Sequence, residues 1–277
     1  ASLGDNKTVI TKYNNPEKLL TDYYEGMVLG EIWGYRIDGL FASDEEATEY
    51  TSKINQDFVN ARILSDKVEP YYRAGDLKFR DLDNNNVINK GDDTVYDPGD
   101  REIIGNETPR YNYSFRLGAD WNGFDLGIFF QGVGKRDWYP SHLSTGFWGP
   151  YARAFTSFIP ENFMDQCWSE ENPGGYLPRF RGYQTFADSQ LGVNNDRYLQ
   201  DASYIRLKNL TVGYTLPVLK KVFTKLRVYF TGENLWYWSP MKKYTKYIDP
   251  EAAGGNGNTG MAYNYSRNFS VGVDITF

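Results

Sequence analysis

Residues 111–131 read YNYSFRLGADWNGFDLGIFFQ and carry the clearest pattern in this chain of 277 residues. Apolar and polar side chains alternate over residues 111–121 and again over residues 124–131, which is the period expected of strands with one apolar face. Asn122-Gly123 separates the two runs. This pair is the strongest short hairpin signal, because both central residues of a type I′ turn need positive φ. The segment therefore predicts a β-hairpin.

Four further segments have strand patterns. Residues 269–277 alternate most strictly and end on an aromatic side chain. Residues 203–215 change the parity of their apolar positions at Lys208-Asn209, where we expect a β-bulge. Residues 226–236 form another amphipathic run, and residues 27–38 form a weaker one. Together with the hairpin, these segments predict six strands.

Long and short connections alternate between the predicted strands. In chain order they are residues 39–110, residues 122–123, residues 132–202, a short turn near Pro217, and residues 237–263. Transmembrane β-barrels have this alternation, with long loops outside the cell and tight turns in the periplasm. If the last strand ends in the periplasm, every short turn falls on the periplasmic side.

Aromatic residues near the short turns fit the belt that such barrels place at the membrane interface. They are Trp121, Phe124, Tyr214, Phe223 and Phe277. We therefore predict an all-β fold in which residues 1–277 form one segment of a transmembrane antiparallel β-barrel with long extracellular loops. Six strands cannot close around a wide lumen, because barrel diameter grows with strand number. The segment is expected to be incomplete as a barrel.

A secreted β-rich glycan-binding module is the alternative. A β-sandwich also has half-buried, alternating strands, and exposed aromatic loops would serve as its binding surface. Its six strands would have to carry two loops of about 70 residues, which compact domains rarely tolerate. The loop lengths therefore favour the barrel.

Composition excludes several other classes of protein. The net charge of -6 and the absence of long Lys/Arg clusters argue against nucleic acid as a partner. One cysteine, Cys167, and one histidine, His142, exclude a disulfide framework and histidine-rich or multi-thiolate metal sites. No GxSxG elbow, P-loop or GxGxxG unit is present, so we expect no enzyme activity and incidental or buried roles for Cys167 and His142.

Six segments, in one order along the chain, carry a family resemblance. They are GEIWGYRIDGLFASDEE (30–46), AGDLKFRDLDNNNVINKGDD (74–93), EIIGNETPRYNYSFRLGADWNGFDLGIFFQGVGKRD (102–137), DASYIRLKNLTVGYTLP (201–217), LRVYFTGENL (226–235) and RNFSVGVDITF (267–277). In these segments the chain resembles the SusC/RagA class of TonB-dependent outer-membrane transporters. The resemblance implies a barrel of about 22 strands, of which this chain supplies about the last six. It also implies a plug and a TonB-binding segment, which these residues do not include.

The resemblance further implies what the intact protein does. Proteins of this class import oligosaccharides or peptides across the outer membrane of a Gram-negative bacterium, with energy transmitted by the TonB complex. A SusD-like surface lipoprotein covers the extracellular loops as a lid, outer-membrane lipid surrounds the barrel, and the C-terminus lies in the periplasm. The strand and loop pattern alone does not indicate transport.

Residues 81–92 have the spacing of an EF-hand calcium loop. Oxygen-bearing side chains fall at loop positions one, three, five, nine and twelve, and position seven offers a main-chain carbonyl. These ligands would be Asp81, Asp83, Asn85, Asn89, Asp92 and the carbonyl of Val87. Asn86 replaces the usual turn glycine and can adopt the left-handed conformation, and Ile88 fits the apolar position eight. We predict a structural Ca²⁺ site, with Mg²⁺ as the second choice; the alternative is a solvated, turn-rich loop.

Two other features lie in the long loops. Ser43 and Glu46 have the spacing of a capping box and predict a helix beginning at residue 44. The segment 132–202 is rich in aromatic residues that could stack on cargo or pack against a partner. The candidates are Phe147, Trp148, Tyr151, Trp168 and Tyr176. For any single one of them, we favour the alternative in which the loop folds on its own aromatic core.

Overall fold

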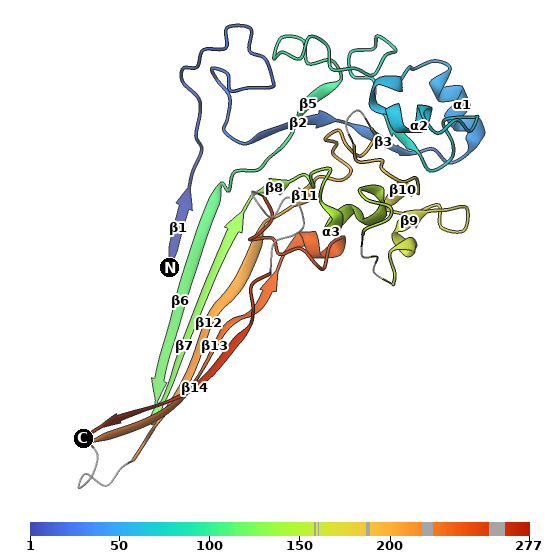
Figure 1. The fold of residues 1–277 in the computed structure, drawn as a ribbon. Helices are drawn as coiled ribbons and strands as arrows, with labels where there is room; N and C mark the ends of the chain where they lie inside the picture. Colours follow the sequence, from blue (N-terminus) through green and yellow to red (C-terminus); the bar gives the residue numbers. More distant parts are fainter. Residues whose placement is uncertain (158, 160, 187–188, 218–223, 255–263) are drawn as a thin grey trace.

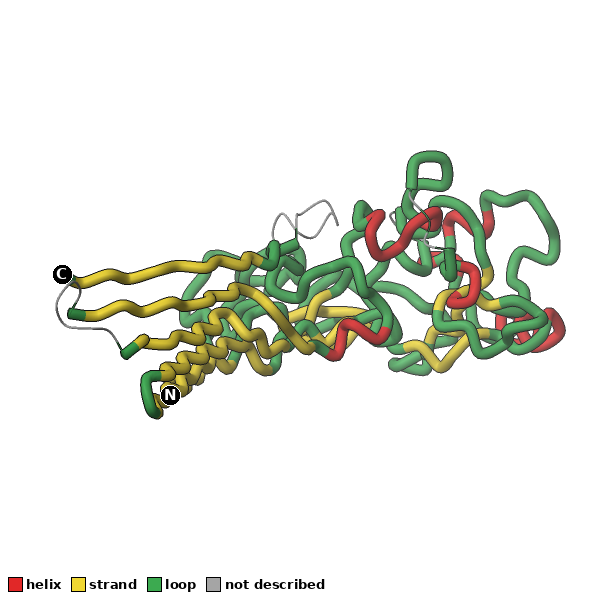
Figure 2. The backbone as a smooth tube through the Cα atoms, turned by 90° about the horizontal axis from the view of Figure 1, so that it is seen from below, coloured by secondary structure: helices red, strands yellow, loops and turns green. Residues whose placement is uncertain are grey.

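The computed structural model describes residues 1–157, 159, 161–186, 189–217, 224–254 and 264–277. The molecule has two parts, a stem of long strands and a larger mass of loops and short elements at one end of that stem (Figures 1 and 2). Both chain ends lie on the stem, and the C-terminus lies at the end away from the loops (Figure 1).

The stem is a six-stranded antiparallel sheet with the order β1-β6-β7-β12-β13-β14. Its strands are β1 (Ser2–Asp5), β6 (Tyr111–Trp121), β7 (Phe124–Gly134), β12 (Tyr204–Leu216), β13 (Lys225–Trp238) and β14 (Asn268–Thr276). Neighbours in the sheet are also neighbours in this chain order. The sheet is therefore an up-and-down meander, with tight connections at one end and long ones at the other (Figure 1).

Five of the six predicted strands are confirmed in this sheet, and the sixth forms in part but outside it. The hairpin forms as expected, with φ of 49° at Asn122 and 87° at Gly123. The predicted strand 27–38 does not join the sheet; it becomes β2 (Glu31–Tyr35) and β3 (Ile37–Leu40), which pair within the loops. The first sheet strand is β1 instead, and it is too short and too polar to show a period of two.

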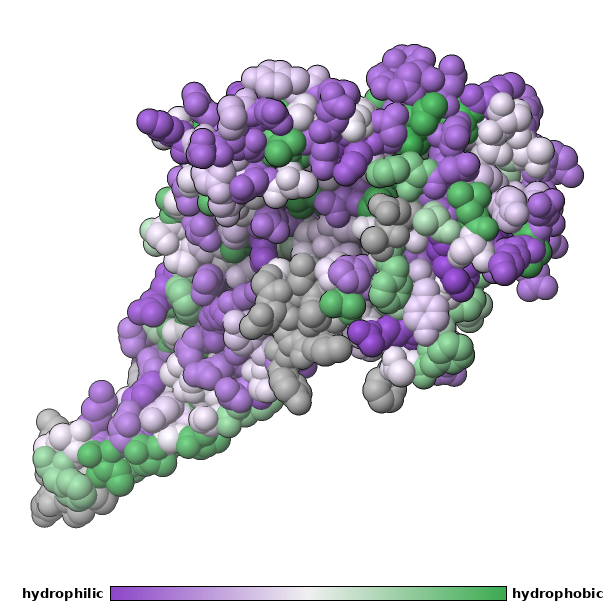
Figure 3. Space-filling model, turned by 45° about the horizontal axis from the view of Figure 1, so that its top comes forward, coloured by the Kyte–Doolittle hydropathy of each residue, from purple (hydrophilic) through white to green (hydrophobic). Residues whose placement is uncertain are grey.

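One face of the sheet is apolar across five strands. Paired positions form a continuous row of apolar side chains from β6 to β14: Ala119, Leu126, Val212, Phe230 and Val271. Much of this face is exposed, as Val271 at 76% and Leu117 at 56% show. Apolar residues gather on the stem, whereas the loop part is mainly hydrophilic (Figure 3). An exposed apolar face of this extent is expected where lipid or another protein covers it.

The predicted bulge keeps that apolar face continuous. The register of β12 against β7 and β13 shifts between Leu207 and Asn209. Beyond the shift, Leu207 pairs with Phe130 on one side and Trp236 on the other, so all three are apolar. The change of parity in the sequence is thus compensated by the extra residue.

Aromatic residues gather at the tight-turn end of the sheet. Trp121 and Phe124 flank the hairpin turn and are 75% and 51% exposed, and Phe277 is 83% exposed. The ring of Tyr214 lies 4.5 Å from that of Phe124, measured between centroids. Phe223 lies outside the described residues. These positions are those of an interfacial aromatic belt.

Three long connections, which we call loops 1, 2 and 3, cover residues 6–110, 135–203 and 239–267. Apart from β2 and β3, loop 1 holds α1 (Asp44–Thr51), η1 (Asp57–Val59), α2 (Ala61–Leu64), β4 (Leu77–Phe79) and β5 (Arg101–Asn106). Loop 2 holds β8 (Asp137–Trp138), α3 (Thr145–Trp148), η2 (Gly149–Tyr151), η3 (Met164–Gln166), β9 (Cys167–Trp168), β10 (Leu177–Arg179) and β11 (Gln200–Asp201). Loop 3 holds η4 (Pro240–Lys243). None of the helices described is long and apolar enough to cross a membrane.

The hydrophobic core lies among the loops. Its largest cluster combines Leu77 and Phe79 of loop 1 with Trp148 of loop 2 and Met241 of loop 3. A smaller cluster in loop 1 packs α1 and α2 together through Phe41 and its neighbours. The loop part is therefore a folded cap over one end of the sheet, and the sheet itself supplies almost none of the core.

Candidate functional site

The predicted cation loop brings three carboxylates together. One oxygen each from Asp81, Asp83 and Asp100 lies within 4.8 Å of the others. Asp81 and Asp83 are at the first and third positions of the predicted loop. Carboxylate oxygens are the ligands that Ca²⁺ and Mg²⁺ prefer. The chemistry of this donor set therefore fits a hard divalent cation.

The backbone of this loop follows the expected path. Asn86 has φ of 65° and takes the turn position, as the sequence predicts. Ile88 is fully buried and anchors the loop in the large core cluster. The Asp81 carboxylate accepts hydrogen bonds from the main-chain N–H groups of Asn84 and Asn86 at 2.7 and 2.8 Å, which curl the loop around it.

The other predicted ligands make different hydrogen bonds. Asn85 donates its amide to Asp83 at 2.8 Å, and Asn89 donates to the Val87 carbonyl at 3.0 Å. Asp92, the twelfth predicted ligand, lies apart from the three carboxylates. Its side chain is exposed and outside the carboxylate cluster, and its main-chain N–H donates to Asp97.

Asp100, which the spacing did not predict, lies beside Asp81 and Asp83. The Asp100 N–H donates to the Asn89 carbonyl at 3.1 Å, and the Asn89 N–H donates to Asp100 Oδ2 at 2.8 Å. These bonds join the ends of the segment 90–99, so that Asp100 follows Asn89 in space. The sequence signal was an extra turn-rich insert with glycines at 91 and 99 and an aspartate directly after it.

Asp100 is a buried carboxylate whose negative charge a cation would balance. Its side chain is fully buried, and that burial raises its pKa, an effect opposed by the hydrogen bonds from Asn89 and Leu82 and increased by the nearby charges of Asp83 and Asp81. A divalent cation would offset the mutual repulsion of the three carboxylates. The cluster is thus suited to cross-linking β5 to the preceding turn.

Two aromatic candidates are core residues. Trp148 and Tyr151 are fully buried, and each uses its polar atom inside the fold. Trp148 Nε1 donates to the carbonyls of Pro140 and Ser141, both at 3.1 Å, and the Tyr151 hydroxyl donates to the Pro178 carbonyl at 2.6 Å. Their assignment as contact residues for cargo or a partner is corrected, because no surface of either side chain is available. The favoured alternative, an aromatic core, is confirmed for both.

Trp168 and Tyr176 also support the fold. Trp168 is 6% exposed and lies under the Arg179 guanidinium, 4.8 Å from the ring centroid. The Tyr176 ring stacks on Tyr244 of loop 3 with centroids 3.6 Å apart and an interplanar angle of 8°. Tyr176 therefore joins loop 2 to loop 3 and is not exposed to a ligand as a free ring.

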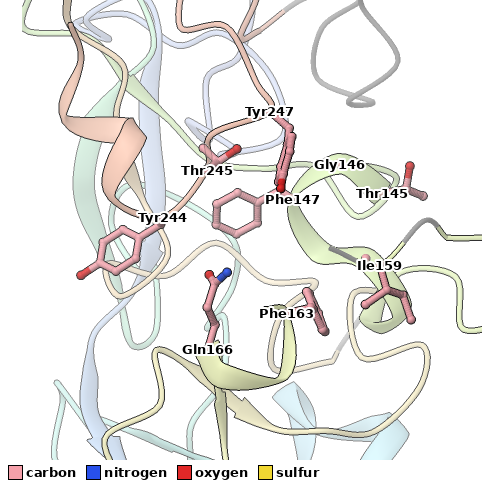
Figure 4. Close-up of a pocket in the computed structure, with 10 residues that line it drawn as sticks. Thr145, Gly146, Phe147, Ile159, Phe163, Gln166, Tyr244, Thr245 and Tyr247 are labelled. Carbon is pink, nitrogen blue, oxygen red and sulfur yellow. The ribbon is translucent and has the colours of Figure 1, made fainter. Parts of the chain in front are cut away.

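Phe147, another of the five candidates, lines a cavity. The cavity has a volume of about 320 Å³ and lies between loops 2 and 3 (Figure 4). Phe147 packs edge-on against Trp148 and Trp138, with ring centroids 4.6 and 6.0 Å apart. The sequence indicated the aromatic content of loop 2, but it gave no signal for the loop 3 residues that complete the cavity.

A buried ion pair joins loops 1 and 2. Arg181 Nη2 lies 3.1 Å from Asp76 Oδ2, and Asp76 is fully buried. Burial raises the pKa of Asp76 to about 6, although the positive charge of Arg181 acts in the opposite direction. A second pair, between Arg206 of β12 and Asp249 of loop 3, is buried on the sheet side of the cap. The three loops are therefore joined to one another and to the sheet by buried polar contacts as well as by apolar packing.

Sequence relatives point to one kind of protein, although no protein-family model matches the sequence. The chain is 28% identical to TonB-dependent receptor P26 of Formosa agariphila over 217 residues, which are 74% of this chain and 20% of that protein. It is 29% identical to TonB-dependent receptor P3 of the same organism over 269 residues, 91% of this chain and 22% of that protein. The chain thus spans about a fifth of the length of these relatives.

Solved structures share the fold. The RagAB peptide transporter matches with a TM-score of 0.55 and 21% identity over 92% of this chain and 23% of that one. The RagAB peptide importer in the closed-closed state also gives a TM-score of 0.55, with 20% identity over 97% of this chain and 25% of that one. The amphipathic meander and its folded cap are therefore an architecture shared with the RagAB peptide transporter.

The sequence relatives and the solved structures are consistent with one another. The alignments with the two receptors cover 74% and 91% of this chain, and the same chain has the fold of the RagAB structures. The resemblance is confirmed: the chain is similar in sequence to TonB-dependent receptors and in fold to the RagAB structures.

Proposed function

We propose that the intact protein is a TonB-dependent importer of the outer membrane and that this chain forms about the last six strands of its barrel with their extracellular loops. The observation that carries the proposal is the row of apolar side chains that runs across five strands, from Ala119 on β6 to Val271 on β14. Such a row is suited to contact with lipid. Two edges support it further, because β1 and β14 each have one unpaired side within the described part of the sheet. Strands from the rest of a barrel would pair with both edges.

Cargo and partners follow from the same proposal. The cargo is an oligosaccharide or a peptide, the energy comes from the TonB complex, and a SusD-like lipoprotein covers the loops. The similarity in fold to the RagAB peptide transporter supports a peptide cargo, whereas the aromatic loops suit either kind of cargo. The folded cap offers exposed apolar side chains at Phe155, Ile159 and Met164 of loop 2 for such a partner.

Purification of the intact protein tests this proposal. A C-terminal tag would be used to recover it from detergent-solubilised outer membranes, and co-purifying chains and small molecules would be identified by mass spectrometry. Recovery with a surface lipoprotein, together with loss of uptake of one oligosaccharide or peptide in a deletion strain, is the expected result. Recovery from the soluble fraction without partners would favour the secreted glycan-binding module instead.

We further propose that Asp81, Asp83 and Asp100 hold a structural Ca²⁺ in loop 1, with Mg²⁺ as the weaker ligand. The convergence of the three carboxylates supports this proposal. When bound, the ion would balance the negative charge of the buried Asp100 carboxylate and would hold the turn against β5. Calcium titration of the intact, chelator-treated protein should show saturable binding, and magnesium should compete weakly. Absence of saturable binding at millimolar calcium would refute this site.

A further inference from the structure

Loop 3 is basic, although the chain as a whole is acidic. Residues 239–267 hold two acidic residues, Asp249 and Glu251, and four basic residues, which are Lys242, Lys243, Lys246 and Arg267. Loops 1 and 2 each hold more acidic than basic residues. The positive charge is therefore a local property of loop 3, at one side of the cap.

Both acidic residues of loop 3 are already paired with cations of β12. Asp249 pairs with Arg206, and both side chains are buried. Glu251 lies 3.0 Å from Arg206 Nε and 2.8 Å from Lys208 Nζ. Within the described residues, none of the four basic residues of loop 3 forms an ion pair. These contacts therefore leave the positive charge of loop 3 without a balancing carboxylate.

Lys242 of η4 lies over the polar face of the sheet. Its Nζ is 3.6 Å from the ring centroid of Tyr237 and donates to the Tyr237 carbonyl at 2.7 Å. Tyr237 pairs with Arg206 on that face, whereas the neighbouring Trp236 and Trp238 pair with apolar residues on the other face. In the barrel that we propose, the polar face lines the channel. An anion that reaches Lys242 would therefore come from the channel and not from the lipid.

The surroundings of Lys242 favour the approach of a negative charge. Burial lowers the pKa of Lys242, and the positive charges of Arg267 and Arg206 lower it further, against the opposing charge of Asp249. Because Arg206 is paired with Asp249, Arg267 is the second cation that an incoming group could contact. A bound anion would offset the repulsion between Lys242 and Arg267. It would also accept a hydrogen bond from the Lys242 ammonium group, which has three donors.

A tyrosine separates the paired cations from the two that remain. The ring centroid of Tyr265 lies 5.1 Å from the Arg206 guanidinium carbon and 4.7 Å from Lys208 Nζ. The side chains of Arg206 and Lys208 are only 1% and 19% exposed. Lys242 is half-buried, and Arg267, directly before β14, is exposed. A group that enters from the channel would therefore meet Lys242 and Arg267 before the ion pairs of β12.

We propose that Lys242 and Arg267 bind a carboxylate group of the cargo at the extracellular end of the channel. The inference rests on the proposed import function, because the polar face lines a channel only in an intact barrel. It narrows the cargo to molecules with negative charge, which are uronate-containing oligosaccharides or acidic peptides. Neutral cargo would leave both cations without a counter-charge.

Direct binding to the intact, detergent-purified protein tests the inference. The probes are two matched pairs. One pair is oligogalacturonate and a neutral galacto-oligosaccharide of the same length, and the other is a glutamate-rich hexapeptide and the same peptide with glutamine in place of glutamate. We expect at least one acidic probe to bind more tightly than its neutral partner, and this preference should decrease at high salt. The pair that shows the preference identifies the carboxylate as part of a sugar or of a peptide.

Substitutions locate the binding site. Lys242→Gln and Arg267→Gln should each weaken the acidic probe about three- to tenfold and leave binding of its neutral partner unchanged. Lys242→Arg keeps the charge and should bind the acidic probe as the parent does. Lys18→Gln is the matched control, because Lys18 is also half-buried and lies over a tyrosine ring, 5.8 Å from the centroid of Tyr96 in loop 1. This variant should bind every probe normally.

Migration as a folded, heat-modifiable barrel on a detergent gel separates loss of binding from loss of fold. Arg267→Gln changes an exposed position, so it keeps the test valid if Lys242→Gln unfolds. Three results would overturn the inference while leaving import intact: equal binding of acidic and neutral probes, no measurable binding of either acidic probe, or equal affinity of the parent and both glutamine variants. If the deletion strain takes up every candidate cargo normally, the proposed function itself fails.

Discussion

Arg227 on β13 reaches across β12 and holds Asp125 on β7, with 2.7 Å between Arg227 Nε and Asp125 Oδ2. The pair passes over Gly213 of β12, where a Cβ atom would lie 2.6 Å from the same Nε. Arg227 Nη1 also bonds Asp274 of β14 at 3.0 Å. One guanidinium therefore connects three strands on the polar face of the sheet, and it can do so because the strand beneath it has no side chain at that point.

Gly213→Val should damage the sheet. The added side chain would displace the Arg227–Asp125 pair, and we expect a loss of about 1–3 kcal/mol in the free energy of unfolding. The measurement is the fraction of intact protein that migrates as a folded, heat-modifiable barrel on a detergent gel over a urea series. Gly118→Val is the matched control, since Gly118 lies on the same face and a Cβ there meets nothing closer than 3.7 Å. Equal behaviour of the two variants would remove the special role assigned to Gly213.

Asp100→Asn and Asp92→Asn should differ in calcium binding. Asp100 belongs to the carboxylate cluster, whereas Asp92 lies in the same loop but outside that cluster. We expect Asp100→Asn to weaken calcium at least about tenfold, because binding strength follows the number of charged ligands. Asp92→Asn should bind as the parent does. Calorimetric titration of both variants decides the matter, and the reverse ranking would restore Asp92 as the ligand.

The contact between loops 1 and 2 should weaken as pH rises from about 4 to about 6. The pKa of Asp76 is raised by burial to about 6, above its usual 3.8, so the folded state holds this proton more tightly than the unfolded state. Stability from this group is fully present below the usual value and is lost as pH rises through the raised one. Hydrogen-exchange protection factors of peptides covering residues 70–80 should show this loss.

Asp76→Asn is the control for that pH dependence. The amide oxygen can still accept the hydrogen bond that the Arg73 N–H donates to Asp76 at 2.9 Å, but the side chain no longer titrates. The protection factors of the variant should therefore be flatter over the same pH range. An unchanged slope would assign the pH dependence to another group.

Ser43→Ala should loosen α1. The Ser43 hydroxyl oxygen accepts the Glu46 N–H at 3.1 Å, and losing an N-cap of this kind costs about 1 kcal/mol. Exchange of the amides in residues 44–51 should become about fivefold faster. Ser43→Asp, which keeps a capping oxygen, should restore the slow exchange. If alanine and aspartate give the same rate, the cap does not stabilise the helix.

Structural features that depend on a few neighbouring residues could be predicted from local patterns in the sequence. The hairpin, the bulge at Lys208-Asn209 and the cap at Ser43 each depend on a few adjacent side chains, and all three are confirmed. The capping box is only partly as expected, because the Glu46 carboxylate accepts from the Ala42 N–H and not from that of Ser43. The spacing of Ser43 and Glu46 in the sequence does not determine which of two adjacent N–H groups the Glu46 carboxylate contacts.

Features that depend on distant contacts could not be predicted in the same way. Residues 27–38 have an apolar pattern like that of a sheet strand, but their partners are other loop segments. Asp100 was missed because a ten-residue insert separates it from the rest of its cluster. The burial of Trp148 depends on residues from three loops, so composition indicated an aromatic core without showing which rings occupy its centre.

The shared core of the cap ties its folding to all three loops. Its buried residues run from Tyr35 to Ala253 and come from all three loops. Contacts this far apart in sequence close slowly, because the intervening chain must first be ordered. The cap therefore becomes complete only when the strands that separate the loops have brought all three together at one end of the sheet.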